Sequence, residues 1–337
     1  MSFNTKISSI LHRLLSLLLP FNKTRIPHGV NLYYHSVSDT PIHNEIRDLQ
    51  IKVSEFKSQL IYLKKHYDVV SLEKFIECYN KNILFSKNNK PIVTLTFDDG
   101  WKDNYDTVFP LIKEFNIPIT IFLNTLYIEN QEPFWFIELC SLLKEIAKNN
   151  NEIEVNNQKI YLDKKHFEAS FLSYWKILST LPEKKRTPYL ETLKNQCPNI
   201  KHPRIVLNWD EIHEMEKSDL VRFAPHTHTH TIISELNDID FAIEIKENWN
   251  ILKQKLISPL PFFCYPNGEI RKNNNSLFEK LELKTAFTTH EDITTHNNHK
   301  FYLPRIKVGR TYQLHHFKNC LNGNTILINK IKKLCHI

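Results

Sequence analysis

The stretch that most constrains the fold is residues 91–100, with the sequence PIVTLTFDDG. Its apolar, β-branched run predicts a buried strand that ends at two adjacent carboxylates, Asp98 and Asp99, and a glycine. In parallel α/β folds, loops assemble active sites at this edge of the sheet. Two neighbouring acids in a low-dielectric pocket cost free energy unless a metal ion or a proton compensates them, so we expect a metal site. A strand-to-helix turn with an aspartate N-cap is the alternative explanation.

Strand and helix patterns alternate on both sides of this stretch. Apolar strand patterns precede His35 and occupy residues 68–70 and 117–125, while Ser54 and Ser71 are the expected N-caps of two helices. Strand–helix–strand units of these lengths are right-handed with parallel strands, which predicts an α/β domain. A mainly helical segment at about 126–208 interrupts the alternation. Its aromatic patch at residues 134–136 indicates core packing, with a lid or an acceptor site as the alternative.

A second polar cluster follows another expected strand, residues 220–225. His226, His228 and His230 alternate with threonines directly after it. In a helical turn, histidines four residues apart would converge on one metal ion, whereas in an extended segment all three would line one face. Either geometry supplies at least two imidazoles beside the two carboxylates, so we expect metal ligation. The helix that comes next has candidate core positions at Ile243, Trp249 and Leu252.

The segments TFDDG and HTHTH resemble the first two motifs of the polysaccharide deacetylases, the NodB-type carbohydrate esterase family 4. Residues 261–268, PFFCYPNG, resemble the third motif in the YPxG variant of exopolysaccharide deacetylases. The resemblance covers about residues 29–310, with 126–208 as an insertion. It implies a distorted, incomplete (β/α) barrel. It also implies hydrolysis of an N-acetyl, less often an O-acetyl, group on a sugar.

The resemblance assigns roles to the motif residues. Asp98 matches the general base, and Asp99, His226 and His230 match the ligands of one divalent metal ion. His228 lies between the ligands and is expected to be a neighbour of the site. Two imidazoles and one carboxylate leave positions open for water and the acetyl oxygen. Zn²⁺ suits these ligands best, and Co²⁺, Ni²⁺, Mn²⁺ or Fe²⁺ also fit them.

The third motif departs from the family pattern. Cys264 stands where an arginine is common, so whatever orients the base must come from elsewhere, and Arg305 is the residue we expect to do so. Tyr265, Pro266 and Asn267 follow as candidate substrate or oxyanion residues. Asn267 replaces a frequent tyrosine, so only a backbone role carries over to it.

Two histidines match the proton donor of the family. The segment LYYH ends at His35 and reads as Leu-x-x-His at a strand end, as in relatives whose strands look circularly permuted. Leu314 and His316 match the family's Leu-x-His motif literally but lie beyond the last expected strand. We expect His35 to be the general acid, with His316 as the alternative.

The two ends of the chain differ from the domain between them. Residues 1–28 are amphipathic and basic, which suits either a helix on a membrane surface or a partner, or a terminal helix packed on the domain. Residues 311–337 predict a basic helical tail. Because the amino-terminal segment makes a poor signal peptide and the six cysteines contain no CxxC pair, we expect a cytoplasmic protein, membrane-associated if the first segment binds lipid.

Composition limits the partners. The net charge of +7 is modest, and the basic residues are mostly scattered lysines, so nothing requires nucleic acid. The chain has only 5 glycines and no phosphate-cradling loop, which counts against a nucleotide-dependent transferase. We expect an N-acetylated carbohydrate substrate from surface glycan assembly, either lipid- or nucleotide-linked or an exported polymer. A catalytically inactive glycan-binding protein on the same fold, or another metal-dependent hydrolase or transferase, is the alternative.

Overall fold

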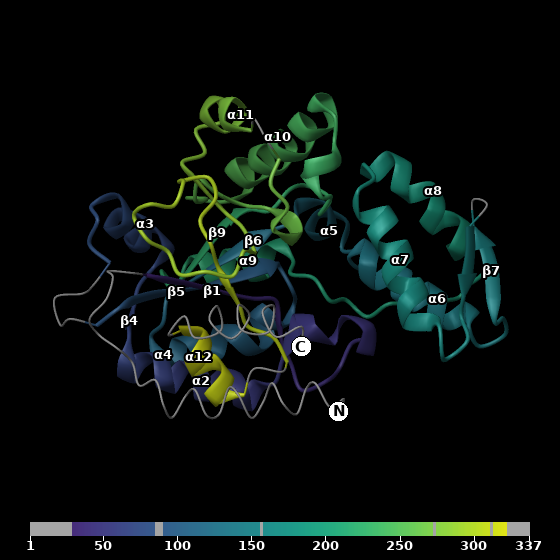
Figure 1. Ribbon diagram of the computed structural model, residues 1–337, viewed down its shortest axis with the longest axis horizontal. Helices are drawn as coiled ribbons and strands as arrows, with labels where there is room; N and C mark the ends of the chain where they lie inside the picture. The colour runs from purple at the N-terminus through teal and green to yellow at the C-terminus, as the bar shows by residue number, and fades with distance from the viewer. Residues whose placement is uncertain (1–28, 85–89, 156–157, 272–273, 311–312, 322–337) are drawn as a thin grey trace, which may run out of the picture.

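The computed structural model describes residues 29–84, 90–155, 158–271, 274–310 and 313–321 (Figure 1). The amino-terminal segment 1–28 and most of the predicted tail 311–337 lie outside the described residues. No helix within the described part is long and apolar enough to cross a bilayer.

A twisted parallel sheet forms the centre of the protein. Its strands run in the order β12-β1-β5-β6-β9, and β4 also pairs with β5. Every residue of β5 is buried, as is typical of a central parallel strand that is covered on both faces. The six strands are β1 (Val30–Tyr34), β4 (Asp68–Val69), β5 (Ile92–Asp99), β6 (Ile119–Leu123), β9 (Val221–Pro225) and β12 (Ile306–Lys307).

The sheet curves into an open barrel. A separate parallel pair, β10 (Phe262–Cys264) and β11 (Thr285–Phe287), lies between the two edge strands. The N–H of Leu260 bonds to the carbonyl of Phe223 in β9 at 2.8 Å, and Phe287 bridges to Leu303 just before β12. These single contacts replace complete ladders, and no continuous ladder closes the ring among the described residues. The α/β fold class and the distorted, incomplete barrel are therefore confirmed.

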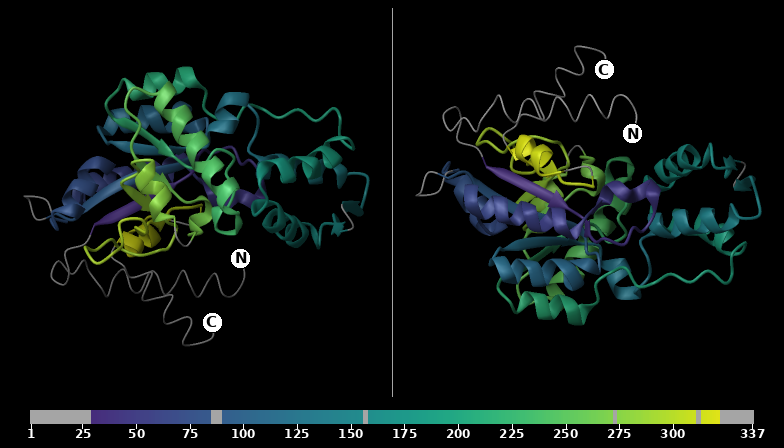
Figure 2. Two further views of the ribbon diagram at one scale, coloured as in Figure 1. Left: turned by 90° about the horizontal axis from the view of Figure 1, so that it is seen from above. Right: turned by 90° about the horizontal axis from the view of Figure 1, so that it is seen from below.

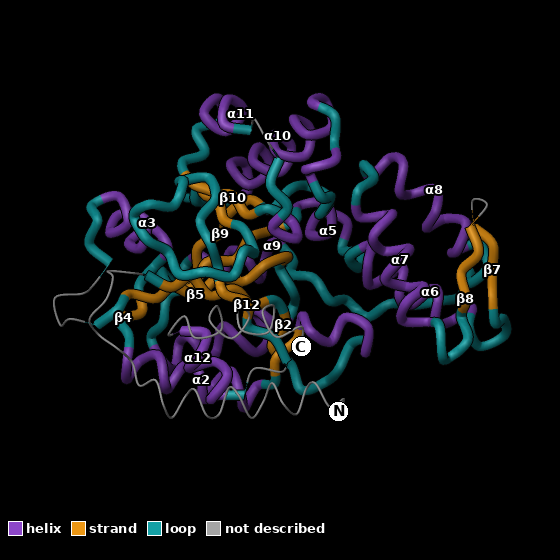
Figure 3. Tube along the Cα trace, viewed as in Figure 1, coloured by secondary structure: helices purple, strands orange, loops and turns teal. Residues whose placement is uncertain are grey.

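Helices cover the outside of this barrel (Figures 1 and 3). Ser71 caps α3 by accepting from the N–H of Lys74, as expected. Ser54 is not a cap, because α2 begins at Val53 after Lys52. The helices of the barrel are α2 (Val53–His66), α3 (Leu72–Asn80), α4 (Phe109–Phe115), α5 (Thr125–Asn130), α9 (Trp209–Glu216), α10 (Asp238–Lys255), α11 (Asn275–Lys280) and α12 (Leu314–Leu321).

Two sequence expectations about these helices need correction or extension. On α10, Trp249 and Leu252 are buried, but Ile243 is 48% exposed and is not a core residue. Ahead of α4, the chain makes one wide turn of π-helix, Asn104–Val108. Short elements complete the barrel, namely β2 (Ser36–Val37), η1 (Asn44–Leu49), β3 (Gln50–Ile51), and the single turns Ile233–Glu235 and Pro266–Gly268.

The part of the predicted insertion that follows α5 forms a separate lobe beside the barrel (Figures 1 and 2). It has its own hydrophobic core, in which Phe134 and Trp135 are buried as expected. It is mainly helical but also contains an antiparallel hairpin. Its elements are α6 (Trp135–Ile146), β7 (Glu152–Val155), β8 (Gln158–Tyr161), α7 (Phe167–Ser179) and α8 (Glu183–Lys194).

Candidate active site

The carboxyl ends of β1, β5, β9 and β10 meet at one pocket of about 490 Å³. This is the edge at which parallel strands place functional side chains. Of the predicted site residues, the pocket is lined by His35, Asp98, Asp99, His226, His230 and Asn267. The strand ends thus bring together residues from three separate sequence motifs.

Asp98 and Asp99 both face this pocket because the backbone changes conformation between them. Consecutive side chains of a strand point to opposite faces. Asp99, however, has a φ of +75° and Gly100 a φ of +85°, so the chain leaves the strand geometry at this point. A Cβ at Gly100 would lie 2.8 Å from the side chain of Leu123. The glycine of the motif is therefore required both for its φ and for its small size.

Asp99, His226 and His230 form a buried group with the composition of a metal site. The Oδ1 of Asp99 lies 3.4 Å from Nε2 of His226 and 3.3 Å from Nε2 of His230. Within the described chain, this buried oxygen has no hydrogen-bond partner. A buried carboxylate oxygen normally has one, and a cation between the three ligand atoms would satisfy it. The residues present therefore fit a divalent metal ion.

Hydrogen bonds with neighbouring groups orient His226 and Asp99 for metal binding. The Nδ1 of His226 lies 2.8 Å from the carbonyl oxygen of Cys264, and because a carbonyl only accepts, Nδ1 carries a proton and Nε2 is the nitrogen directed at Asp99 that could ligate an ion. The indole of Trp101 donates to Oδ2 of Asp99 at 3.1 Å, which leaves Oδ1 for the ion. Burial opposes the charge on Asp99, but the two imidazoles outweigh it and hold the pKa of this carboxyl well below its usual range.

The loop that carries the histidines is neither helical nor extended. Thr227 and His230 have φ values of +64° and +53°. These turns direct His226 and His230 into the pocket, whereas Nδ1 of His228 lies 2.8 Å from Oγ1 of Thr125. His228 is not among the lining residues, which places it beside the site, where we expected it.

Asp98 is held by Arg305. Two parallel bonds of 2.7 Å join Nη1 and Nη2 of the guanidinium to the two carboxylate oxygens, and both side chains are buried. Burial raises the pKa of Asp98, but the charge and hydrogen bonds of Arg305 outweigh burial, so this pKa lies below its usual value. Asp98 is therefore ionised at neutral pH, as a general base must be.

Arg305 has no donor left for a substrate. Its remaining N–H groups bond to the carbonyl of Thr288 at 3.0 Å, to Oγ1 of Thr96 at 3.0 Å and to Sγ of Cys264 at 2.9 Å. Arg305 therefore reaches the strand end and holds Asp98, as we expected. The small thiol of Cys264 leaves room for its guanidinium.

The third motif contributes less to the pocket than expected. The side chain of Tyr265 is fully buried against Phe263 and Phe278, and its N–H bonds to the carbonyl of Phe287. Neither Tyr265 nor Pro266 lines the pocket, so their assignment as substrate or oxyanion residues is corrected.

Asn267 does line the pocket, with a φ of +55°. Gly268 makes this turn possible. Its φ is +72°, and a Cβ there would lie 2.3 Å from the backbone nitrogen of Thr289. The glycine of the YPxG motif therefore allows the turn that places Asn267 at the pocket.

Of the two candidate proton donors, the structure brings His35 to the pocket. His316 lies on α12, where its neighbour Phe317 packs against Tyr62 of α2. The pKa of His35 is lowered to about 4 because burial disfavours the imidazolium, although the two carboxylates act in the opposite direction. At neutral pH His35 is therefore uncharged, which the sequence did not indicate.

Phe136 from α6 lines the pocket, and it belongs to the aromatic patch for which a lid or an acceptor site was the alternative to core packing. Several other lining residues were not predicted. Phe171, Leu172 and Trp175 from α7 form a wall made by the insertion, and Glu45 and Asp48 of η1 complete one side. The apolar spacing of 171, 172 and 175 marks one helix face. Spacing alone could not show what that face contacts.

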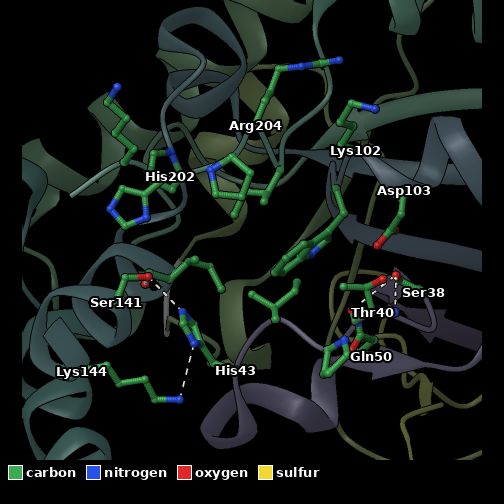
Figure 4. A pocket seen from close by; sticks show the side chains of 18 of the residues that line it. Ser38, Thr40, His43, Gln50, Lys102, Asp103, Ser141, Lys144, His202 and Arg204 are labelled. Carbon is green, nitrogen blue, oxygen red and sulfur yellow. Dashed lines mark hydrogen bonds between the residues drawn. The ribbon is translucent and has the colours of Figure 1, made fainter. Parts of the chain in front are cut away.

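A second pocket, of about 530 Å³, lies between the insertion and the barrel (Figure 4). It contains none of the predicted site residues. Two of its charged side chains are engaged by protein partners, Lys144 with Glu45 at 2.5 Å and Arg204 with Glu211 at 2.6 Å. Figure 4 shows His43 between Ser141 and Lys144. The convergent carboxylates and imidazoles single out the 490 Å³ pocket as the candidate active site.

Comparisons with known proteins agree with this geometry. A poly-β-1,6-N-acetyl-D-glucosamine N-deacetylase of Staphylococcus epidermidis is 28% identical over 212 residues, which cover 61% of this chain and 70% of the relative. An enzyme of the same name from Staphylococcus aureus is 25% identical over 210 residues, with shares of 61% and 70%.

Solved structures share the fold. The Streptococcus pyogenes deacetylase PplD in complex with acetate aligns with a TM-score of 0.61 at 17% identity, over 88% of this chain and 99% of the other. IcaB from Ammonifex degensii aligns with a TM-score of 0.57 at 17% identity, over 88% and 97%. The family model described as polysaccharide deacetylase matches residues 85–158 and 172–286, which is more than half of the chain. The protein belongs to the polysaccharide deacetylase family.

Proposed function

We propose that this protein is a metal-dependent hydrolase that removes the N-acetyl group from an amino sugar in a glycan. One observation carries the proposal, namely the buried group Asp99, His226 and His230 beside a carboxylate, Asp98, that Arg305 keeps ionised. The relatives named above, which deacetylate poly-β-1,6-N-acetylglucosamine, support an N-acetylglucosamine polymer as the first substrate to test.

The residues divide the chemistry between them. A divalent ion held by Asp99, His226 and His230 would supply Lewis-acid polarisation of the acetyl carbonyl and acidification of water. Asp98 accepts the proton of the attacking water, because it is ionised and lines the pocket. Asn267 stands at the turn where a backbone N–H serves the oxyanion in the family pattern, and this backbone role is part of the proposal. Zn²⁺ is the ion we expect from two imidazoles and one carboxylate.

The leaving amine needs a proton, and we assign its delivery to His35. Since its pKa is about 4, His35 enters the reaction neutral, so the proton must reach it during turnover. The proton that Asp98 takes from water is the available source. His35 lines the same pocket and can pass that proton to the amine nitrogen as the C–N bond breaks.

Replacing His35 by alanine should lower kcat for N-acetyl substrates by about 10²–10⁴-fold, the usual contribution of a positioned proton donor. Hydrolysis of a fluorogenic aryl acetate should fall much less, because a phenolate leaves without a proton. The comparison variant is His316→Ala, which should keep both activities. Equal losses on the amide and the ester in His35→Ala, or a selective amide loss in His316→Ala, would contradict the assignment.

The direct test of the proposed function is acetate release from a β-1,6-linked N-acetylglucosamine pentasaccharide. The parent chain loaded with Zn²⁺ should release acetate, and Asp98→Asn should lose about 10²–10⁴-fold in rate. The alternative of a catalytically inactive glycan-binding protein predicts binding without acetate release in both proteins. The presence of Asp98 beside the proposed metal ligands favours an enzyme over a protein that only binds glycans.

A further inference from the structure

One wall of the candidate active site comes from the insertion. Phe171 and Leu172 lie four and three residues before Trp175, which places both beside it on one face of α7, and all three line the pocket. Leu172 is 47% exposed, although most large apolar side chains of this lobe are buried. Phe171 is 1% exposed and supports this face, whereas Leu172 and the half-buried Trp175 remain accessible from the pocket. Accessible apolar side chains in a pocket indicate a contact with substrate.

The position of this face is fixed by stacked side chains. The indole of Trp175 stacks on Trp135, with centroids 6.3 Å apart and an angle of 17°, and the guanidinium of Arg186 lies 4.8 Å from the Trp135 ring. Arg186 is itself buried and donates to the carbonyl of Thr229 at 2.9 Å and to Oγ1 of Thr231 at 3.2 Å. Thr229 directly precedes the ligand His230, so one arginine fixes both the aromatic stack and the loop of the metal site.

The metal-site loop is tied to the insertion by two further contacts. The N–H of Ile232 bonds to the carbonyl of Ser179 at the end of α7, and the ring of Phe136 lies 5.4 Å from that of His230. The insertion is therefore held against the catalytic edge. A binding surface on α7 would keep a constant position relative to the reacting atoms.

The charges around the pocket indicate what kind of ligand this wall takes. Apart from the predicted site residues, the charged lining consists of Glu45, Asp48, Glu269 and Lys307. Since Glu45 is paired with Lys144, two carboxylates remain against one lysine, which disfavours a diphosphate-linked sugar. An uncharged pyranose suits the wall better, because its ring carbons present an apolar C–H face that packs on an aromatic ring while its hydroxyl groups meet polar neighbours.

We propose that Trp175, with Phe171 and Leu172, is a subsite for the uncharged sugar residue adjoining the acetylated one in a glycan chain. This inference rests on the proposed function and refines it, since it selects a glycan chain over a nucleotide- or lipid-diphosphate-linked monosaccharide.

The test compares Trp175→Ala and Trp175→Phe with a matched control, Trp209→Ala. Trp209 is half-buried on α9, bonds to Glu129 through its indole and does not line the pocket. We expect Trp175→Ala to lower the ratio of kcat/KM for the β-1,6-linked N-acetylglucosamine pentasaccharide to kcat/KM for an aryl acetate by at least about tenfold. Trp175→Phe should restore most of the ratio, and Trp209→Ala should leave it unchanged.

Calorimetric titration with the pentasaccharide gives a readout that does not need turnover. Trp175→Ala should weaken binding by a similar factor, and uridine diphosphate N-acetylglucosamine should bind the parent chain less tightly than the pentasaccharide does. An unchanged ratio and affinity in Trp175→Ala, or tighter binding of the nucleotide sugar, would overturn the subsite. If the parent binds the pentasaccharide through Trp175 but releases no acetate, the proposed function fails and the subsite stands.

Discussion

Replacing Arg305 by methionine should destabilise the protein by about 3–5 kcal/mol and remove most of its deacetylase activity. The guanidinium and the carboxylate of Asp98 are both buried and joined by two bonds of 2.7 Å, and removing one member of such a pair leaves an uncompensated buried charge. Urea unfolding and acetate release measure the two losses. Wild-type stability and turnover in Arg305→Met would contradict the assigned role of this pair.

The pH dependence of the pair has a definite sign. The folded-state pKa of Asp98 lies below its usual value, so the pair stabilises the fold fully above the usual carboxyl range, and this stabilisation is lost as the pH falls through the folded-state pKa. Burial raises the pKa of Asp98, and without Arg305 the main opposing effect is gone. The acidic limb of kcat/KM should therefore move to higher pH in Arg305→Met, a shift that general loosening of the structure would not produce.

A double-mutant cycle separates the interaction between Asp98 and Arg305 from the effect of each side chain on the rest of the protein. Asp98→Asn also leaves a buried charge, that of Arg305, so we expect it to lose stability as well as activity. The double variant Asp98→Asn/Arg305→Met should be more stable than the sum of the single effects predicts, because no unpaired charge remains. Its activity should stay as low as that of Asp98→Asn. Strictly additive stability losses would show that the two side chains act independently.

Substituting a ligand of the proposed metal site should have the other large effect. His230→Ala should lose the bound ion and lower kcat/KM more than about 10²-fold, because the ion would contribute several kcal/mol of transition-state stabilisation. Elemental analysis after dialysis and acetate release on the same preparation give the two readouts. His228→Ala is the matched control, since His228 belongs to the same loop but lies against Thr125 outside the pocket. Loss of the ion in His228→Ala and not in His230→Ala would refute the ligand set.

The sequence predicted the parts of the site that lie directly at strand ends. Asp98 and His226 each follow a run whose apolar pattern marks a buried parallel strand, and parallel strands place their carboxyl ends at one edge. The contact between Arg305 and Asp98 was also expected, because a residue near the last strand can reach the same rim. For such residues, the apolar pattern of the sequence and the parallel arrangement of the strands are enough to predict a place in the site.

Other parts depend on packing that no local pattern records. Tyr265 was expected at the pocket, yet its ring fits among Phe263 and Phe278 in the core, and the choice depends on the neighbouring helix. The wall formed by Trp175 requires the insertion to pack against the barrel, which Arg186 secures through the carbonyl of Thr229. The depressed pKa of His35 follows from burial in the assembled pocket. These features become visible only when distant segments are placed together.

Titration of the metal-free chain with Zn²⁺, with acetate release from the pentasaccharide and the bound metal followed in the same samples, tests the proposed metal dependence. We expect activity to rise in proportion to the bound ion, to reach its plateau at one ion per chain and to be absent at every point in His226→Ala. Full activity in the metal-free chain, or binding of an ion that His226→Ala retains, would contradict this expectation.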